Sequence, residues 1–349
     1  MVMVMRTPVP CVGSGLRQRG AALLMAMLTV ALVATLAAGA LWQQWRNVEI
    51  EASERNRVQA GWILGGALDW ARLILREDAR NGGPDHLGEP WSIALSESRL
   101  STFLAMDRNN TDQSDDIFLS GQITDAQSRM NVMNLVTGGK VSQPDVQAFK
   151  RLFELVGLDP SELDQMAANL LLAVGGSTDA GAGEPVPLLP RRVQQLRWLG
   201  LSEGSLRQLE PFVTVLPVHT PVNLNTAAAE VIAASIPGVE LADARRMVAE
   251  RERKPYQTLA EAGKSIPAAV GGLNATQLSV ATRFFEVRGR LRMDQTVVEE
   301  RSLVQRNGLN VIVLWRERAA LGAGAEPKLP PTGGVGGTSS DRGVLTMRP

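Results

Sequence analysis

The feature that most constrains this chain is a run of 22 residues, 21–42, that contains no charged side chain. As an α-helix this run reaches about 33 Å, which is enough to cross the hydrocarbon core of a bilayer. The twenty residues before it contain no acidic side chain and three arginines, Arg6, Arg17 and Arg19. Because a basic flank stays on the cytoplasmic side, the sequence predicts one membrane span with a cytoplasmic amino end and the rest of the chain outside.

A cleaved secretory signal peptide is the alternative interpretation, because Ala38-Gly39-Ala40 fits a small-residue cleavage site. The uncharged run is long for the apolar core of a signal peptide, and it continues without a break into a helix-forming stretch, residues 43–80. Apolar side chains recur there in steps of three and four, which predicts one amphipathic helix that extends the span and ends at Asn81-Gly82-Gly83-Pro84. The residues expected on its apolar face are Ala60, Ile63, Ala67, Trp70, Ala71, Ile74 and Leu75.

Composition narrows the classes of function. The 349 residues include 36 basic and 36 acidic side chains, so net charge gives no reason to expect nucleic acid as the main partner. A single cysteine, Cys11, excludes an intramolecular disulfide, and the core must hold the fold. Two histidines, His86 and His219, and one tyrosine, Tyr256, leave little material for acid–base catalysis or zinc binding, which disfavours an enzyme.

Strand patterns occur in two distant parts of the chain. Ile117, Leu119 and Ile123 alternate with polar residues and predict one strand. Near the carboxyl end, three segments alternate like an antiparallel meander, with a turn at Asn307-Gly308; they cover residues 284–293, 295–307 and 309–318. We expect a single sheet that is interrupted by an insertion.

The segment between these strands is predicted to be helical. Asp159-Pro160-Ser161-Glu162 has the arrangement of a capping box, and the apolar stripe after it predicts a core-facing helix. A Gly/Pro-rich loop, residues 175–190, separates this helix from a second helical set, residues 191–282. MNVMNL (130–135) and VNLNTA (222–227) are alike and each precedes a helical group, so we expect a weak duplication and two related helical lobes.

A basic leader that ends in Gly20 and runs directly into an uncharged span resembles a prepilin peptidase signal. This resemblance implies cleavage between Gly20 and Ala21 and methylation of the new Ala21 amine. Most pilin-like proteins have a glutamate as the fifth mature residue, where this chain has Met25. A carboxylate at that depth is costly unless a neighbouring subunit supplies a partner. A subunit with nothing ahead of it in a filament needs no such carboxylate, and the pattern resembles the minor pseudopilin K family of type II secretion.

The motif D-A-Q-x-R-[apolar]-N-x-x-N-L, at residues 125–135, resembles the sequence of the same family. The residues that carry this match are Asp125, Ala126, Gln127, Arg129, Asn131, Asn134 and Leu135. Asn223 and Asn225, in VNLNTA, belong to the other segment of strong resemblance. The resemblance implies a structural role for these polar residues and no catalytic residue.

The fold that the resemblance implies is α+β. A long amino-terminal helix packs on a small antiparallel sheet, and a large helical insertion forms two lobes of helix-hairpin-helix or SAM-like type. The expected division is leader 1–20, membrane helix 21–42, periplasmic continuation 43–80, pseudopilin core 81–134 and 283–318, inserted helical domain 135–282 and disordered tail 319–349.

The resemblance also implies a function without chemistry. Members of this family cap the tip of the pseudopilus with the minor pseudopilins I and J, so the chain would promote assembly and protein export across the outer membrane. About 150 inserted residues cannot be packed at every step of a thin filament, but they fit at its end. The expected partners are pseudopilins I and J, the prepilin peptidase and other type II secretion components, with no nucleic acid. The expected place is the bacterial inner membrane, with a periplasmic body.

An acidic loop is a candidate calcium site. The oxygen ligands are crowded within ten residues, which suits calcium, although the spacing and glycine of an EF-hand are missing. A solvated acidic turn is the alternative. The candidate ligands are Asp107, Asn109, Asp112, Asp115 and Asp116.

Three further motifs suggest other classes of protein. IPGVELADARRMV resembles a helix-hairpin-helix turn, which would suit a membrane-anchored DNA receptor, but Glu240 would repel a phosphate and the basic residues are balanced by acids. Ser202 lies in a G-x-S-x-G string after a polar helical stretch, where a hydrolase needs a buried strand and a nearby His86 or His219. Gly263-Lys264-Ser265 lacks the first glycine and the strand of a phosphate-binding loop.

Overall fold

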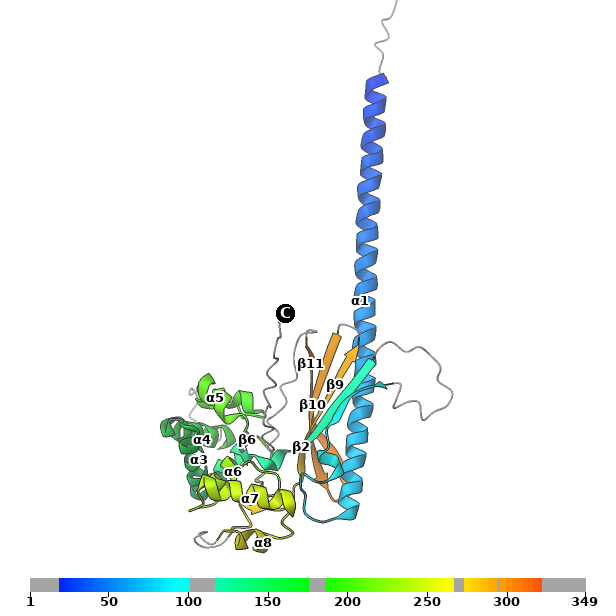
Figure 1. Cartoon of the computed structure of the whole chain (residues 1–349). Coiled ribbons are helices and arrows are strands. Elements are labelled where there is room, and N and C mark those ends of the chain that lie inside the picture. Colours follow the sequence, from blue (N-terminus) through cyan, green and yellow to red (C-terminus); the bar gives the residue numbers. More distant parts are fainter. Residues whose placement is uncertain (1–18, 101–116, 176–185, 267–272, 294–295, 322–349) are drawn as a thin grey trace, which may run out of the picture. The chain divides into compact units, whose positions relative to one another are not determined.

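The computed structural model describes residues 19–100, 117–175, 186–266, 273–293 and 296–321 (Figure 1). The chain divides into two compact units, Met1–Gly61 and Trp62–Pro349. The long helix α1, Arg19–Asn81, contributes to both units.

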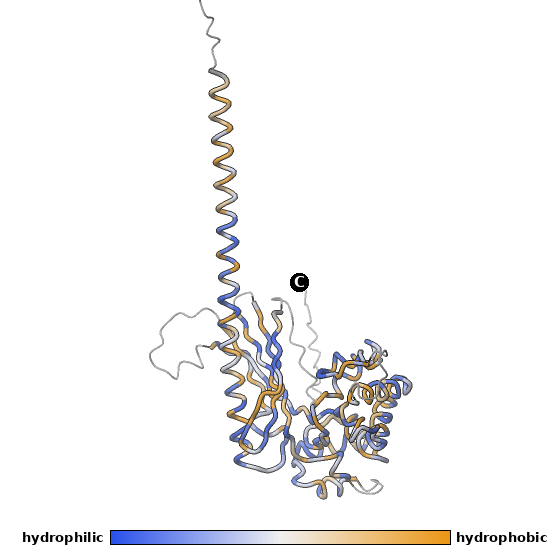
Figure 2. The backbone as a smooth tube through the Cα atoms, turned by 180° about the vertical axis from the view of Figure 1, so that it is seen from behind, coloured by the Kyte–Doolittle hydropathy of each residue, from blue (hydrophilic) through white to orange (hydrophobic). Residues whose placement is uncertain are grey.

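The described part of the first unit is helical throughout. An 18-residue window near the start of α1 has a mean hydropathy of 2.4, and none of its residues is buried. Figure 2 shows the same stretch as a predominantly apolar tube that becomes polar further along the helix. Among the described residues, this is the helix whose length and composition suffice to cross a membrane, and it fits a transmembrane anchor.

The second unit contains an antiparallel sheet in the order β1-β2-β9-β10-β11. Its strands are β1 (Leu95–Arg99), β2 (Ile117–Asp125), β9 (Phe284–Met293), β10 (Thr296–Asn307) and β11 (Asn310–Leu321). Strands β2 and β9 are direct neighbours, with Ile117 opposite Met293 and Asp125 opposite Phe285, although residues 126–283 separate them in the chain. The four predicted strands are present, and the fifth, β1, was missed because LSESR is polar and has no apolar alternation.

The final turns of α1 pack on one face of this sheet. Leu68, Ala71 and Leu75 of the helix share a buried cluster with five sheet residues, Ile123, Phe285, Val287, Val304 and Val311, and with Trp91. The predicted apolar face was wrong in part. Leu64 and Leu68 are buried, whereas Trp70, which was expected on that face, is 51% exposed. The buried residues Leu64, Leu68, Ala71 and Leu75 form a stripe that is displaced around the helix from the predicted one, and this stripe does not include Trp70.

Close approach of α1 to the sheet depends on a glycine in β9. A Cβ atom at Gly289 would lie 3.1 Å from Leu64 Cδ2, which is tighter than ordinary van der Waals contact. By contrast, a Cβ at Gly66, on the outer side of α1, would meet nothing within 4 Å.

We therefore expect Gly289→Val to lower the unfolding free energy by about 1–3 kcal/mol, because the added methyl groups overpack the helix–sheet contact. The matched variant Gly66→Ala should raise it by up to about 1 kcal/mol, because alanine favours a helix and meets no neighbour. Denaturant unfolding of the detergent-solubilised chain measures both. Equal effects of the two variants would contradict the close packing of α1 against β9.

The insertion is helical and divides into two lobes. The predicted second helical set, residues 191–282, does not follow this division, because its first helices, residues 193–209, pack in the first lobe. Lobe 1 (residues 130–214) contains α3 (Gln143–Val156), α4 (Pro160–Gly175), η5 (Val193–Leu199) and α5 (Glu203–Leu209), with the short hairpin β4 (Val136–Thr137) and β5 (Lys140–Val141). Lobe 2 (residues 222–279) contains α6 (Ala229–Ser235), α7 (Leu241–Arg253) and α8 (Leu259–Lys264). The remaining short helices are η1 (Pro90–Ser92), η2 (Ala126–Ser128) and η3 (Val132–Leu135).

In each lobe the first and last residues pair with each other as a two-residue parallel strand pair. In lobe 1, β3 (Met130–Asn131) pairs with β6 (Val213–Thr214). In lobe 2, β7 (Val222–Asn223) pairs with β8 (Leu278–Ser279). MNVMNL contains β3 and VNLNTA contains β7. The two similar sequence segments therefore each supply one strand of a short parallel pair.

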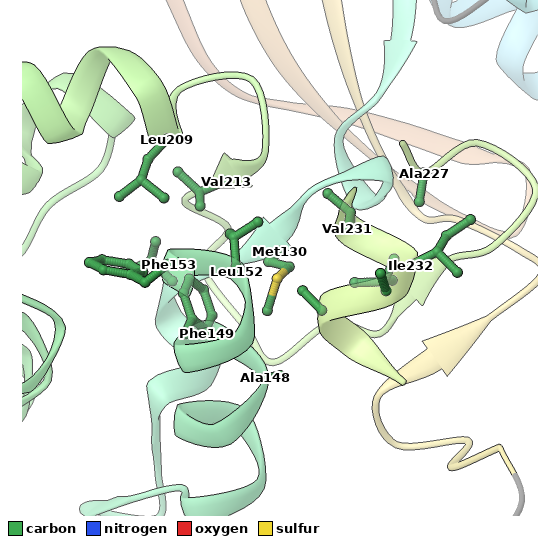
Figure 3. Packing of buried hydrophobic residues seen from close by; sticks show 14 of the residues in the cluster. Met130, Ala148, Phe149, Leu152, Phe153, Leu209, Val213, Ala227, Val231 and Ile232 are labelled. Atoms are coloured by element: carbon green, nitrogen blue, oxygen red, sulfur yellow. The ribbon is translucent and has the colours of Figure 1, made fainter. Parts of the chain in front are cut away.

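Helix α3 joins the cores of the two lobes. Figure 3 shows Phe149, Leu152 and Phe153 of α3 between Leu209 of lobe 1 and Ile232 of lobe 2. Side chains from both lobes form one buried cluster, and the Arg151 Nε atom donates a hydrogen bond across it to the Ala234 carbonyl at 2.8 Å. The lobes therefore pack as one body with one apolar core.

The predicted cap of α4 is present in part. The Asp159 side chain accepts a hydrogen bond from the Ser161 backbone N–H at 2.8 Å. The Glu162 carboxylate accepts from the Ser202 backbone N–H at 3.1 Å, so it links α4 to the start of α5.

Candidate functional site: a polar junction between sheet and lobes

The motif residues gather where the chain leaves the sheet and enters the lobes. We use the term polar junction for the side chains of Asp125, Gln127, Asn131, Asn134, Asn223 and Asn225, all of which are buried. They lie at the end of β2, in η2, in β3, in η3, in β7 and in the turn that follows β7.

Asp125 is the last residue of β2 and the buried acid of the polar junction. Its carboxylate accepts hydrogen bonds from the Gln127 backbone N–H at 2.6 Å, the Thr226 hydroxyl at 2.6 Å and the Asn223 amide at 2.9 Å. Burial raises the pKa of Asp125, and the three donors oppose that rise. The end of the strand is thereby fastened to the first residues of lobe 2.

Gln127 connects three segments that are far apart in the chain. Its amide nitrogen donates to the Pro221 carbonyl at 2.9 Å, just before lobe 2. Its amide oxygen accepts from the Arg283 backbone N–H at 2.8 Å, just before β9. The exit from the sheet, the entry to lobe 2 and the return to the sheet therefore meet at one side chain.

The asparagines act in the same way in both lobes. Asn134 donates to the Thr220 carbonyl at 2.8 Å and accepts from the Thr220 backbone N–H at 3.1 Å. Asn225 makes the corresponding pair of bonds with Tyr256, each at 2.9 Å. Such two-point contacts fix a loop segment in one position, and their recurrence supports the duplication.

Asn131 and Asn223 are also placed alike. Each side-chain oxygen accepts a hydrogen bond from the backbone N–H two residues later: Asn131 from Met133 and Asn223 from Asn225. Asn131 also accepts from the Leu216 backbone N–H at 3.0 Å, which ties the inter-lobe segment to lobe 1.

Arg129 belongs to a charged cluster on the sheet. It forms an ion pair of 3.0 Å with Glu286, which also pairs with Arg301 at 2.9 Å. Burial disfavours the charged carboxylate, but the neighbouring guanidinium groups outweigh burial and lower the pKa of Glu286 to about 2.

We predict that Asn223→Ala lowers the unfolding free energy by about 1–3 kcal/mol. The Asn223 amide now donates hydrogen bonds to the buried Asp125 carboxylate and to the Asp85 carbonyl. The substitution removes both bonds and leaves these buried acceptors with one donor fewer. Gln147→Ala, on the exposed side of α3, should change stability by about 0.5 kcal/mol or less. Thermal unfolding followed by circular dichroism compares the two, and equal midpoints would contradict the role of the junction.

A second polar cluster, which the sequence did not predict, lies at the end of α1. The Arg306 guanidinium pairs with Asp78 of α1 and with Asp85 of the following loop, donates to the Thr282 carbonyl and lies 4.9 Å from the Phe285 ring centre. We call this group of contacts the Arg306 latch. No local pattern links Asp78 to an arginine 228 residues away, so only the fold reveals it.

The Arg306 latch lines a cavity of about 430 Å³ that Glu89 also borders. Glu89 accepts hydrogen bonds from the His86 backbone N–H at 2.9 Å and from the Trp91 indole at 2.8 Å. Burial raises the pKa of Glu89 to about 7, and the adjacent Asp78 carboxyl contributes to the rise. Asp78, Asp85 and Glu89 are close enough to share a cation, and the Arg306 guanidinium already lies among them.

Stability should fall as the pH rises through neutrality. The folded protein holds a proton on Glu89 up to about pH 7, whereas an unfolded glutamate releases it near its ordinary value of 4.5. The stabilisation is therefore complete below pH 4.5 and is lost as the pH rises through about 7.

The measurement is the unfolding midpoint between pH 5 and pH 8. Glu89→Gln should flatten the decline, because glutamine does not titrate, and the exposed Glu203→Gln should leave it unchanged. An identical slope in Glu89→Gln would contradict this assignment.

The remaining candidates have ordinary structural positions or lie outside the description. Ser202 caps α5, where its hydroxyl accepts from the Ser205 backbone N–H at 3.1 Å. Gly263 and Lys264 lie in α8, and no strand directly precedes that helix in the described residues. Gly238 takes a positive φ of 77° in the turn between α6 and α7, with Glu240 as the cap of α7.

The processing and calcium candidates stay predictions. Gly20 and Ala21 lie in the first turn of α1. The five calcium candidates, Asp107, Asn109, Asp112, Asp115 and Asp116, fall in residues 101–116, outside the described residues, as do most of the predicted tail and the first 18 residues of the leader.

An apolar helix that continues into a helix packed on an antiparallel sheet defines the class of pilin-like subunits, here with a helical insertion between two neighbouring strands. Two models of a family described as type II secretion system (T2SS), protein K, match residues 128–218 and 222–281. The first range spans lobe 1 and the second spans lobe 2, and residues 219–221 between them lie outside both ranges.

Curated relatives match nearly the whole chain. Type II secretion system protein K of Pseudomonas aeruginosa is 28% identical over 339 residues, covering 91% of this chain and 96% of the relative. That of Pectobacterium carotovorum subsp. carotovorum is 27% identical over 331 residues, covering 86% and 96%. The chain is therefore similar to type II secretion system protein K along most of its length, and these matches support a minor pseudopilin K.

A solved structure has the same fold. The crystal structure of the GspK-GspI-GspJ complex from the type 2 secretion system of enterotoxigenic Escherichia coli contains a chain that matches with a TM-score of 0.59 and 18% identity. The match covers 76% of this chain and 98% of the other, and it confirms the α+β pseudopilin fold.

Proposed function

We propose that this protein is the tip subunit of the type II secretion pseudopilus, where it promotes pseudopilus assembly and export across the outer membrane. The observation that carries the proposal is the position of the lobes. They are inserted between β2 and β9, which are adjacent in the sheet, so the pilin-like sheet stays intact while its connection is greatly enlarged. A body of this size suits one end of a thin filament and not every repeat.

The fifth residue after the proposed cleavage supports the same position. Met25 is apolar and replaces the carboxylate that would pair with the amine of a subunit further ahead. A tip subunit has no such neighbour, so an apolar residue there avoids an unpaired charge in the membrane. The body would then lie in the periplasm, anchored in the inner membrane through residues 21–42.

Minor pseudopilins I and J are the proposed partners, because a chain of this fold is found in the GspK-GspI-GspJ complex. The outer face of α1 supplies a suitable surface. Trp62 is 77% exposed, Trp70 51% and Leu73 50%, and all three follow helical spacing around Gly66. Large apolar side chains beside a glycine notch suit the packing of another subunit's helix.

We expect Trp62→Glu to weaken binding to an I–J pair by about 2 kcal/mol or more, which is roughly thirtyfold. The reason is that an anchoring indole is replaced by a charge that must be desolvated. Trp198→Glu, which changes a half-exposed tryptophan of η5 in lobe 1, should leave the affinity unchanged. Calorimetric titration of the purified chain measures both, and equal affinities for the parent and Trp62→Glu would contradict this surface.

Processing by the prepilin peptidase is tested separately. After co-expression with the peptidase, mass spectrometry should find an amino terminus at methylated Ala21. Gly20→Ala should abolish that product, and Gly15→Ala, in the same leader, should not. A terminus near Leu41 in the parent chain would instead indicate an ordinary secretory signal peptide.

A further inference from the structure

Two tryptophans mark the end of the uncharged part of α1. Trp42 and Trp45 lie three residues apart, so they share one side of the helix. Their ring centres are 5.4 Å apart with the planes tilted by 41°, and they are 60% and 58% exposed. Two large side chains therefore form one aromatic patch that the described residues leave uncovered.

The residues before and after this patch have opposite chemistry. The run before it carries no charge over residues 21–42. The stretch after it, residues 46–61, carries Arg46, Glu49, Glu51, Glu54, Arg55 and Arg57. Glu51 and Arg55 pair at 3.1 Å, and Glu54 and Arg57 at 3.9 Å, with all four side chains more than 60% exposed. Such a surface belongs in water, so the aromatic patch lies at the change from an apolar to an aqueous environment.

We propose that Trp42 and Trp45 anchor α1 in the lipid head-group layer on the periplasmic side of the inner membrane and so set the depth of the helix. The inference rests on the proposed membrane span and adds its outer boundary.

An indole suits that layer because its apolar ring enters the edge of the acyl chains while its N–H meets polar head groups. The length agrees as well. From Ala21 to Trp42 the helix rises about 32 Å, close to the thickness of the hydrocarbon core. A cytoplasmic-side Ala21 therefore places the indoles at the opposite face.

Setting the depth also positions the start of the helix. The depth at which the indoles lie fixes how far Ala21 lies from the cytoplasmic surface, so the aromatic patch would hold the subunit at one height in the bilayer.

The test uses the full chain expressed alone, with Cys11→Ser, so that any new cysteine is unique. Single cysteines at Ala31, Gly39, Gln43 and Asn47 are exposed in spheroplasts to a membrane-impermeant maleimide. In the parent, labelling should be absent at Ala31, weak at Gly39 and complete at Asn47, with half labelling near Gln43.

The decisive comparison changes both tryptophans to leucine, Trp42→Leu with Trp45→Leu. Leucine lengthens the apolar run and has no N–H for the head groups, so the half-labelled position should move toward Asn47 by about one helical turn, ~5 Å. The control Trp62→Leu should leave it at Gln43. An unchanged boundary in the double variant would overturn the anchor, as would a parent boundary away from Gln43. Full labelling at Ala31 would instead contradict the membrane span itself.

Discussion

The buried Asp125 carboxylate is the contact on which the connection between sheet and lobes depends. It lies at the last position of β2 and takes its side-chain donors from Asn223 and Thr226, at the start of lobe 2. A buried carboxylate without such donors would cost several kcal/mol, so the strand end and lobe 2 are held as a pair. Gln127 adds the return strand to the same point through the Arg283 backbone. These few bonds hold the start and the end of the large insertion together, and β2 and β9 remain neighbouring strands of the sheet.

The Arg306 latch extends this connection to the helix. Asp85 belongs to both systems, because its carboxylate pairs with Arg306 while its carbonyl accepts from Asn223. Arg306 and Asp85 together therefore join the end of α1, the sheet and lobe 2. The contacts at this point are buried ion pairs and hydrogen bonds. Glu89 lies beside this point, and its burial raises its pKa to about 7.

Much of the fold could be predicted from local patterns. The uncharged run, the alternation in β9 to β11 and the cap before α4 each follow from adjacent residues, and the match of MNVMNL with VNLNTA indicated two lobes. The features that the sequence did not predict depend on contacts between residues that are far apart in the chain. The polar strand β1 has no pattern of its own, and the rotation of α1 that buries Leu64 and exposes Trp70 is set by the sheet beneath it. The junction residues were found by resemblance, but their partners Thr220 and Tyr256, and the whole Arg306 latch, were not, because those contacts join distant segments.

The central claim is that this subunit stands at one end of the pseudopilus. Immunogold labelling of assembled pseudopili, with an antibody fragment raised against lobe 2, tests it most directly. The account predicts gold at a single end of each filament, because a body enlarged by the inserted lobes suits one end of a thin filament and not every repeat. Gold distributed along the filament would contradict the account.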